Sequence, residues 1–392
     1  MFQGKLRQHL AGFAAALLLI GASASAAYSG QPIIWETSGR AELLKGDARG
    51  VSISDTGMLM LAPALTEIFN TEQAFVWSSA VDNQGNVYLG TGHDGKIYRV
   101  SADGRGSLLY DAAELDVTAL AAARDGAIYA GTSPDGKVYR ITPDGHAEVF
   151  FDPADKYVWS LAVLADGSLA VGTGDNGKLY RVRTAGAKPE ASLLIATNQT
   201  HVISLAVTAQ GDLIAGTDPG GLVLRISPEG KAFALFDAQL REIHALAPAP
   251  DGSIYALALS EAATAGRQQS SSATLAPTVE GSSVPATSVT ITPIDETGAP
   301  IQASGQATRS RTDTSSARSA VFRILPDGGT DVVWSSSSIT AFAIVPGLQP
   351  GSVLIGTADK GRVYSVTNDG RDTLLLQSSE GQISSFLMRS GQ

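Results

Sequence analysis

Short apolar stretches alternate with polar turns along most of the chain, a pattern typical of β-strands and not of helices. Between Val76 and Asp111, turns rich in Gly, Asp and Asn separate four such stretches. The stretches are residues 76–81, 86–91, 96–100 and 107–110. Glycine supplies the positive φ that a tight hairpin needs, and Asp and Asn tolerate it next best. The segment therefore predicts a meander of four short strands.

This unit recurs along the chain at intervals of about 41 to 44 residues. A Gly-Thr step marks most copies, at Gly90-Thr91, Gly131-Thr132, Gly172-Thr173, Gly216-Thr217 and Gly356-Thr357. A degenerate copy lies before the last of these, with residues 243–259 as its first half and 321–334 as its second. Four strands per unit of this length are typical of a β-propeller, in which each unit is one blade and closure of the ring protects the sheet edges.

Six units fit between residues 76 and 377, and residues 383–387 match the first strand of a seventh. Residues 50–61 predict a strand, a turn and a strand, which could pair with the C-terminal strand in one blade. The sequence thus predicts an all-β fold, a β-propeller of seven four-stranded blades, with the ring closed by pairing of the N- and C-terminal strands. A reading frame truncated at residue 392, with strands or a domain missing beyond it, is the alternative left open.

Residues 1–26 have the three-part pattern of a secretory signal peptide. Lys5 and Arg7 precede an apolar run over residues 10–20, and small residues follow, with cleavage predicted at Ala24-Ser25-Ala26. The run is too short for a comfortable membrane span, and no later stretch approaches about 18 apolar residues. We therefore expect the propeller to comprise residues 27–392, without a membrane span after cleavage. Export without any cysteine favours a bacterial periplasm or exterior.

A long insertion is predicted from residue 260 to residue 320, inside the fifth complete blade. It holds 12 serines and 10 threonines in 61 residues and no aromatic residue. Such a segment buries too little apolar surface to offset its ordering entropy, so we expect it to be disordered. It replaces the short turn between the second and third strands of that blade. It is interpreted as a tolerated surface insertion, or as a flexible flap or partner-recruitment tether over one mouth of the channel.

Composition narrows the function classes. With 28 basic and 38 acidic residues the net charge is −10, which argues against nucleic-acid binding because that requires clustered Lys and Arg. The lack of cysteine excludes thiolate metal sites, Fe-S clusters and cysteine nucleophiles. One charge does repeat: an arginine on the third strand predicts cross-strand pairs with acidic residues. These arginines are Arg99, Arg140, Arg181, Arg225 and Arg323.

The run from Ala80 to Gly90, AVDNQGNVYLG, resembles the blade motif of NHL-repeat proteins and of streptogramin-lyase and gluconolactonase-like propellers. It is also similar to propeller repeats in the extracytoplasmic sensor regions of bacterial two-component regulators. The residues that match the motif are Asp82, Gly85, Asn86 and Tyr88, whereas Gly90-Thr91 departs from its usual Ala-Asp. The resemblance covers about residues 50 to 392 and concerns residues that form hairpins. It implies fold more than activity, because propellers host many unrelated functions.

Candidate site residues lie where the innermost strands begin, at one mouth of the channel. The first positions of these strands are expected at Phe75, Asp116, Tyr157, His201, Glu242, Ser338 and Gln382. Two positions further on, the expected residues are Trp77, Thr118, Trp159, Ile203, His244, Thr340 and Ser384. An apolar-walled pocket with a few polar groups is the usual composition of a ligand site. The predicted ligand-binding residues are Trp77, Asp116, Tyr157, Trp159, His201, Glu242 and His244.

The sequence therefore predicts an exported ligand-binding or protein-interaction module that binds a protein or a small molecule at the channel mouth. The lack of a recognisable catalytic set favours binding over catalysis. One alternative is a metal-dependent lyase or lactonase, because the resembling propellers hold a divalent metal in the channel, with a histidine base in the streptogramin lyases. Asp116, Glu242, His201 and His244 would then be the ligands or bases. A second alternative is the sensor portion of a larger signalling protein. No cofactor and no specific ligand can be named from these residues.

Overall fold

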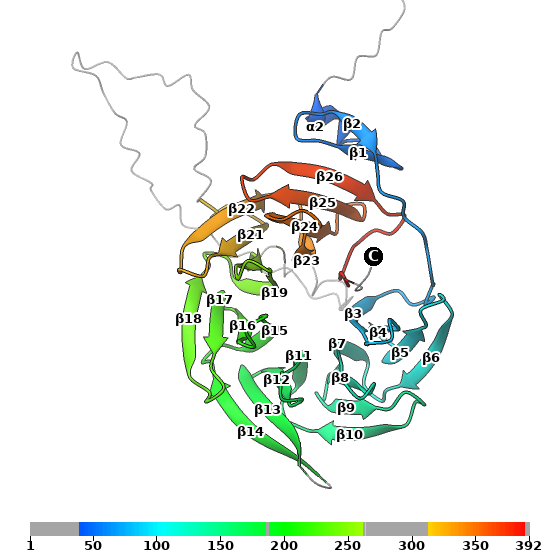
Figure 1. The fold of residues 1–392 in the computed structure, drawn as a ribbon, viewed down its shortest axis with the longest axis vertical. Helices are drawn as coiled ribbons and strands as arrows, with labels where there is room; N and C mark the ends of the chain where they lie inside the picture. The colour runs from blue at the N-terminus through cyan, green and yellow to red at the C-terminus, as the bar shows by residue number, and fades with distance from the viewer. Residues whose placement is uncertain (1–38, 186–187, 262, 264–312, 389–392) are drawn as a thin grey trace, which may run out of the picture.

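The computed structural model describes residues 39–185, 188–261, 263 and 313–388, which form six antiparallel sheets arranged in a ring about a central axis (Figure 1). The predicted all-β propeller with four-stranded blades is confirmed. The predicted signal peptide, residues 1–26, lies outside the described residues. Among the residues that are described, no helix is long and apolar enough to cross a membrane.

In every blade the strands follow chain order from the channel outward. Blade 1 comprises β3 (Val76–Val81), β4 (Val87–Thr91), β5 (Lys96–Val100) and β6 (Gly106–Asp111). Blade 2 comprises β7 (Asp116–Ala122), β8 (Ile128–Ser133), β9 (Val138–Ile141) and β10 (Ala147–Phe151). Blade 3 comprises β11 (Tyr157–Val163), β12 (Leu169–Gly174), β13 (Lys178–Ala185) and β14 (Lys188–Ala196).

The remaining three blades repeat the arrangement. Blade 4 comprises β15 (His201–Val207), β16 (Leu213–Asp218), β17 (Leu222–Ile226) and β18 (Ala232–Asp237). Blade 5 comprises β19 (Glu242–Pro248), β20 (Ile254–Leu259), β21 (Ser319–Ile324) and β22 (Thr330–Ser336). Blade 6 comprises β23 (Ala341–Pro346), β24 (Ser352–Thr357), β25 (Arg362–Thr367) and β26 (Asp372–Gln377). Glycines in the first turn of blades 1 to 5 have φ between 81° and 88°, as hairpin chemistry requires.

The N-terminal strands extend blade 6. β1 (Val51–Ile53) pairs with β26, and β2 (Leu59–Leu61) pairs with β1, so that the sheet has six strands. Before them, the short helix α2 (Arg40–Leu43) also lies against blade 6, where the Arg40 guanidinium donates to the Asp372 carboxylate. Arg362 donates to the carbonyls of Leu44 and Gly46 at 2.8 and 2.7 Å. These contacts fix the segment to one blade.

The prediction of seven blades closed by pairing of the terminal strands is therefore wrong. The described residues form six blades, and residues 50–61 pair with the outer edge of blade 6 and not with the C-terminal segment. Residues 382–388 follow the sixth blade without forming a strand. The physical reason lies in long-range contacts such as that from the Ser52 hydroxyl to the Leu375 carbonyl, which no local pattern encodes.

Neighbouring blades meet through a glycine and a β-branched side chain. In blades 1 to 4 the Gly of the Gly-Thr step lies against the Val or Ile near the start of the next innermost strand, and in blade 6 it lies against Ile383 of the C-terminal segment. A Cβ added to any of these glycines would lie 2.5 to 2.9 Å from that side chain, so only glycine fits. The pairs are Gly90–Val117, Gly131–Val158, Gly172–Val202, Gly216–Ile243 and Gly356–Ile383. The repeated Gly therefore reports packing between blades in addition to the turns.

At the interface between blades 5 and 6 the large and the small residue have changed places. Leu257 pairs with Ala245 where the other blades carry the glycine, and Ala341 stands where they carry Val or Ile. Leu257 and Ala341 are both fully buried in the same hydrophobic cluster. The larger side chain has moved across the interface, which keeps the interior close-packed.

The arginine series pairs with the acid that precedes the first-turn glycine. Arg181 contacts Asp166 at 2.5 Å, Arg140 contacts Asp125 at 2.6 Å, and Arg323 contacts Asp251 at 2.8 Å. The predicted pairing with acidic residues is thus observed for these three arginines, but the acids lie in the first turn of the blade and not on a neighbouring strand. Blade 4 carries Gln210 at the acid's position, and Arg225 instead lies over the Phe233 ring.

The predicted insertion lies between the second and third strands of blade 5, because β20 ends at Leu259 and β21 begins at Ser319. The last two residues of the predicted span, Ser319 and Ala320, belong to β21. Residues 262 and 264–312 lie outside the described residues, and the expectation of disorder there remains a prediction.

Candidate functional site

All seven predicted site residues lie on the innermost strands, near the end at which these strands begin. Asp116, Tyr157, His201 and Glu242 are the first residues of β7, β11, β15 and β19. Each pairs with the last residue of the second strand of its blade, beside the turn to the third strand. Trp77, Trp159 and His244 lie one or two residues into their strands. The structure therefore places the candidates at one end of the channel.

The first cluster joins blades 1 and 2. The rings of Phe75 and Trp77 stack with centroids 5.1 Å apart and planes 4° from parallel. The Trp77 indole N–H donates to Asp116 Oδ1 at 3.3 Å, and the same oxygen accepts from the His93 backbone N–H at 3.0 Å. The His93 imidazole meets the Phe75 ring edge-on, at 5.1 Å. An aromatic stack is thus anchored by a carboxylate of the next blade.

The second cluster repeats this design in blades 3 and 4. Tyr157 and Trp159 stack with centroids 5.0 Å apart and an interplanar angle of 19°. The Trp159 indole N–H donates to His201 Nδ1 at 3.0 Å, and the His201 ring meets the indole at 87°. Here an imidazole takes the place that Asp116 has in the first cluster.

The hydrogen bond from Trp159 fixes the state of His201. An indole N–H can only donate, so His201 Nδ1 must accept and the ring proton must sit on Nε2. Burial lowers the pKa of His201 from 6.5, although the nearby carboxylates of Asp218, Asp175 and Glu242 act in the opposite direction. The imidazole is therefore neutral at pH 7.

The third cluster lies on β19. Glu242, which is 3% exposed, has its Oε1 2.6 Å from His244 Nδ1. Because a carboxylate can only accept, His244 Nδ1 carries the proton of this hydrogen bond. The His244 ring also contacts Phe342 of β23, with centroids 5.7 Å apart. A buried carboxylate thus orients an imidazole that is 19% exposed.

The contacts among the seven residues join adjacent blades or neighbours on one strand. Trp77 and Asp116 form one pair; Tyr157, Trp159 and His201 form a triplet; Glu242 and His244 form a second pair. The last two groups are linked electrostatically, since the charge of Glu242 acts on His201. Among the described residues, no observed contact brings the three groups together in a single pocket.

Three residues outside the predicted ligand-binding set belong to the clusters, and two expected strand positions in blade 6 are shifted. Phe75, His93 and Phe342 belong to the clusters although they were not chosen. In blade 6, Ala341 pairs with Thr357 as Val76 pairs with Thr91, which puts Phe342 at the position of Trp77. The expected alignment through Ser338 and Thr340 is therefore wrong by two residues. The correct alignment of blade 6 is not evident from the sequence, because Ala341 stands where the other blades carry Val or Ile.

One signal in the sequence could have found the clusters. A second glycine follows the Gly-Thr step only in blades 1 and 3, as Gly92 and Gly174, the two blades that carry a Trp on the innermost strand. A Cβ at Gly92 would lie 1.9 Å from Trp77 Nε1, and one at Gly174 would lie 2.3 Å from Trp159 Nε1. The glycine leaves room for the indole.

The donor groups do not fit a divalent metal. Among the described residues there is no group of three or more His, Asp or Glu side chains placed to hold a metal ion. Asp116 Oδ1 is engaged by two N–H donors, and Glu242 is bonded to His244. We therefore derive no chemistry through a metal at this end of the channel.

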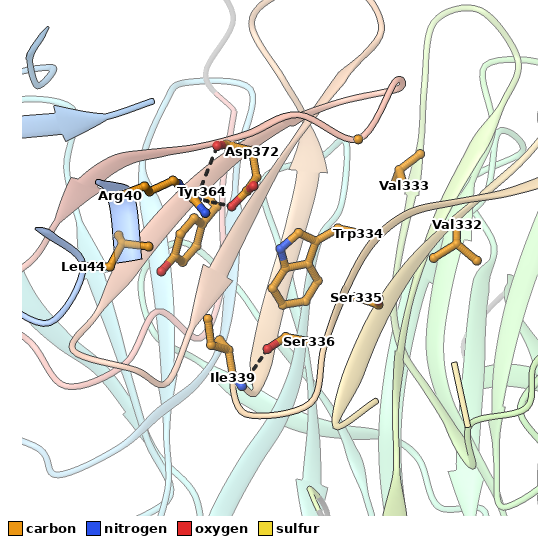
Figure 2. A pocket seen from close by; sticks show the side chains of 11 residues that line it. Arg40, Leu44, Val332, Val333, Trp334, Ser335, Ser336, Ile339, Tyr364 and Asp372 are labelled. Atoms are coloured by element: carbon orange, nitrogen blue, oxygen red, sulfur yellow. Dashed lines mark hydrogen bonds and ion pairs between the residues drawn. The ribbon is translucent and has the colours of Figure 1, made fainter. Parts of the chain in front are cut away.

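A separate cleft of about 340 Å³ lies away from these clusters, between blades 5 and 6. Figure 2 shows Trp334 on one side and Tyr364 on the other, with the Arg40–Asp372 pair above them. Trp334 and Tyr364, which line the cleft, are both buried. Arg40 and Leu44 also line the cleft, so it lies where the N-terminal segment packs on blade 6.

No family model and no curated protein sequence matches this chain. Solved structures are similar in fold. A virginiamycin B lyase from Staphylococcus aureus is 13% identical, with a TM-score of 0.49 and coverage of 81% of this chain and 84% of the lyase. A gluconolactonase from Xanthomonas campestris is 18% identical, with a TM-score of 0.41 and coverage of 53% of this chain and 75% of the other. The resemblance predicted from the blade motif is thus confirmed for the fold alone.

Proposed function

We propose that the chain is a ligand-binding module, and that its ligand binds against the two aromatic stacks at the end of the channel where the innermost strands begin. The observation that carries the proposal is the repeated stack in blades 1 and 3, each fixed by an indole hydrogen bond to the next blade. Repeat packing does not need this arrangement, because blades 2 and 4 carry Thr118 and Ile203 at the Trp positions.

The chemistry of the clusters suits a ligand with a flat apolar face and polar edges. The Phe75 ring stacks on Trp77 through one face and remains 37% exposed. Polar groups flank both stacks, with Asp116 at one and His201 at the other. Sugar rings and aromatic side chains of peptides combine a flat apolar face with polar groups, and such ligands bind to sites of this composition.

The test is a ligand-observed NMR screen in which saturation transfer reports binding. The probes are mono- and disaccharides in one panel and amides of aromatic amino acids in the other. We expect at least one panel to show transfer that is lost in the double variant Phe75→Ala/Tyr157→Ala. The control Phe233→Ala removes an exposed ring from β18, on the outer side of blade 4, and should keep the transfer. The proposal fails if neither panel binds or if the double variant binds as the parent does.

A second candidate function, catalysis by proton abstraction, rests on the Glu242–His244 pair. A buried carboxylate that orients a partly exposed imidazole through Nδ1 is an arrangement suited to a general base. This form of the enzyme alternative uses no metal. Hydrolysis of a simple aldonolactone can test it: His244→Gln should abolish turnover, and Glu242→Gln should lower it by about 10²-fold or more. No turnover above the buffer rate by the parent protein would remove this candidate.

We also propose that the protein is exported to the bacterial periplasm or beyond the cell. The support is the signal-peptide pattern of residues 1–26 and the absence of cysteine. N-terminal sequencing of the protein recovered from a periplasmic fraction should begin at Ala27. Recovery from the cytoplasm with Met1 retained would contradict export.

A further inference from the structure

The two aromatic stacks lie at equivalent places of a unit that is two blades long. Where the innermost strand begins, blades 1 and 3 each carry an aromatic ring followed two residues later by a tryptophan. In each case the indole donates to the first residue of the next innermost strand, Asp116 of β7 or His201 of β15. Blades 2 and 4 supply these acceptors and carry Thr118 and Ile203 in place of the tryptophan. Blades 1 and 2 are therefore built like blades 3 and 4.

Each stack is flanked by one carboxylate and one imidazole, with their positions exchanged. At the first stack the carboxylate is Asp116, and the imidazole is His93 in the turn after β4. At the second stack the imidazole is His201, and the carboxylate is Asp175 in the turn after β12, whose charge acts on His201. His93 and Asp175 stand at the same place of the turn, with φ of 70° and 80°. The two stacks thus share their chemical composition although different positions supply it.

Both stacks keep a polar atom that the described residues do not use. Asp116 Oδ1 accepts from two N–H groups, whereas Oδ2 has no hydrogen-bond partner within the described ranges. His201 Nδ1 accepts from the Trp159 indole, and the Nε2–H has no acceptor in the same part of the chain. One stack therefore offers an acceptor and the other a donor. A hydroxyl group suits both, because it donates as well as accepts.

A pyranose ring with equatorial hydroxyls matches this set of groups. Its axial C–H groups form a flat apolar face that packs on an aromatic ring, and its hydroxyls lie around the edge. The rings of Phe75 and Tyr157 are at least partly exposed beside their stacked indoles. A phenyl group would pack on these rings but would leave the polar atoms of Asp116 and His201 without a partner. The polar atoms therefore favour a sugar over an aromatic side chain of a peptide.

The two stacks are separate from each other. β7 of blade 2 lies between β3 and β11 (Figure 1), and its Thr118 hydroxyl bonds to the carbonyls of Gly131 and Val158. Among the described residues no observed contact joins the first stack to the second. A single sugar unit therefore has two places to bind, and a chain of linked units can occupy both at once.

We propose that the two stacks are equivalent subsites for one oligosaccharide of equatorially substituted pyranose units, which spans blade 2 and packs on Phe75 and Tyr157 together. This inference rests on the function proposed above and specifies the chemical class of the ligand and the number of units that the protein contacts. Linking the units makes the second contact intramolecular. The oligomer should therefore bind at least about tenfold more tightly than its single unit.

Indole N–H signals in the NMR spectrum can report on each stack separately. The variants Trp77→Phe and Trp159→Phe assign the two signals, and Trp334 in the cleft between blades 5 and 6 is an internal control. The full chain is titrated with glucose and N-acetylglucosamine, and with β-1,4-linked oligomers of each of increasing length. A single unit should shift the Trp77 and Trp159 signals with separate affinities. An oligomer that spans blade 2 should shift both with one common, tighter affinity.

Two single variants test whether the subsites are independent. Phe75→Ala should remove the response of Trp77 to the single unit and keep that of Trp159, and Tyr157→Ala should do the reverse. In each variant the oligomer should lose at least about tenfold in affinity and bind about as tightly as the single unit. Phe233→Ala, on the outer side of blade 4, should change neither affinity. An unchanged Trp334 signal shows that the variants fold.

The outcomes distinguish this inference from the function on which it rests. If one variant abolishes the response of both indoles, or if affinity does not rise with oligomer length, the stacks are not linked subsites; the inference is then refuted while ligand binding stands. If no sugar moves either signal but amides of aromatic amino acids do, the ligand class is refuted and ligand binding again stands. If neither kind of probe moves either signal, both proposals fail.

Discussion

Val158 of blade 3 packs against Gly131 of blade 2 so closely that a Cβ on the glycine would lie 2.5 Å from Val158 Cγ1. The same relation holds at three other interfaces between blades and for Gly356 against Ile383 of the C-terminal segment, although the residues in each pair are far apart in the sequence. It explains why a glycine recurs inside a strand, where it would otherwise weaken the sheet.

Adding a methyl group at this contact should destabilise the propeller. We expect Gly131→Ala to lower the free energy of unfolding by about 1–3 kcal/mol through overpacking. The double variant Gly131→Ala/Val158→Ala should lose at least about 1 kcal/mol less than the sum of the single variants. Urea unfolding measures all three. Gly46→Ala is the control, since its nearest neighbour would be 3.5 Å away, and strictly additive losses would contradict the packing argument.

The arginine–aspartate pairs predict that one substitution lowers the stability of the fold and another raises it. Asp166→Asn removes the partner of Arg181, and Gln210→Asp supplies one for Arg225. Both positions are exposed, so we expect changes of only about 0.2–1 kcal/mol in the free energy of unfolding, downward for the first and upward for the second. Thermal unfolding in low and high salt tests this, because screening should shrink both effects. A gain from Gln210→Asp that persists in high salt would mean that the pairing is not its cause.

The decrease in the free energy of unfolding caused by Asp166→Asn should depend on pH, because the Asp166 carboxylate titrates. The Ser168 hydroxyl, with the Ser168 backbone N–H and Arg181, lowers the pKa of Asp166 to about 2, against the opposing effect of burial. A pKa depressed in the folded state adds stability above the ordinary value of 3.8, and this is lost as the pH falls through 2. The difference between the parent and Asp166→Asn should therefore be full at pH 6 and shrink between pH 4 and pH 2. A difference that stays constant over this range would refute the shift.

His201 should destabilise the fold as the solution is acidified. Its pKa is lowered in the folded state, so below pH 6.5 the unfolded chain binds a proton that the folded chain excludes. Stability is therefore full above pH 6.5 and falls as the pH drops toward the folded-state pKa. Trp159→Phe removes the donor to Nδ1 and should raise the pKa of His201, as NMR titration of the imidazole will show. Trp334→Phe, in the cleft of Figure 2, is the control and should leave that titration unchanged.

Gly174→Ala should disturb the second cluster more than the fold. The new methyl would lie 2.3 Å from Trp159 Nε1, so the indole must move and its bond to His201 Nδ1 must break. We expect an altered tryptophan emission spectrum and a raised pKa of His201. Ser133→Ala, at the matching position of blade 2, where Thr118 replaces the Trp, should change neither. An unchanged spectrum in Gly174→Ala would show that the indole does not depend on this glycine.

The four-stranded blades could be predicted from the sequence, but the way in which the ring closes could not. The strand pattern and the hairpin glycines are local, so the four-stranded units and the placement of Asp116, Tyr157, His201 and Glu242 could be predicted. The number of blades could not, because residues 50–61 and 383–387 both look like strands while their partners are set by distant contacts. The aromatic stacks were foreseeable as a group of candidates. Their hydrogen bonds depend on the offset between blades, which periodicity does not specify.

The exchange of Leu257 and Ala341 limits how the repeats can be rearranged. A blade with the usual Gly-Thr step could not replace blade 5 without leaving a cavity against Ala341, and blade 6 could not follow another blade without the same loss. Duplicating blade 5 would place its Leu257 against an incoming Ile243. Blades 5 and 6 are therefore one unit of inheritance: recombination among the repeats can move them together but cannot separate them.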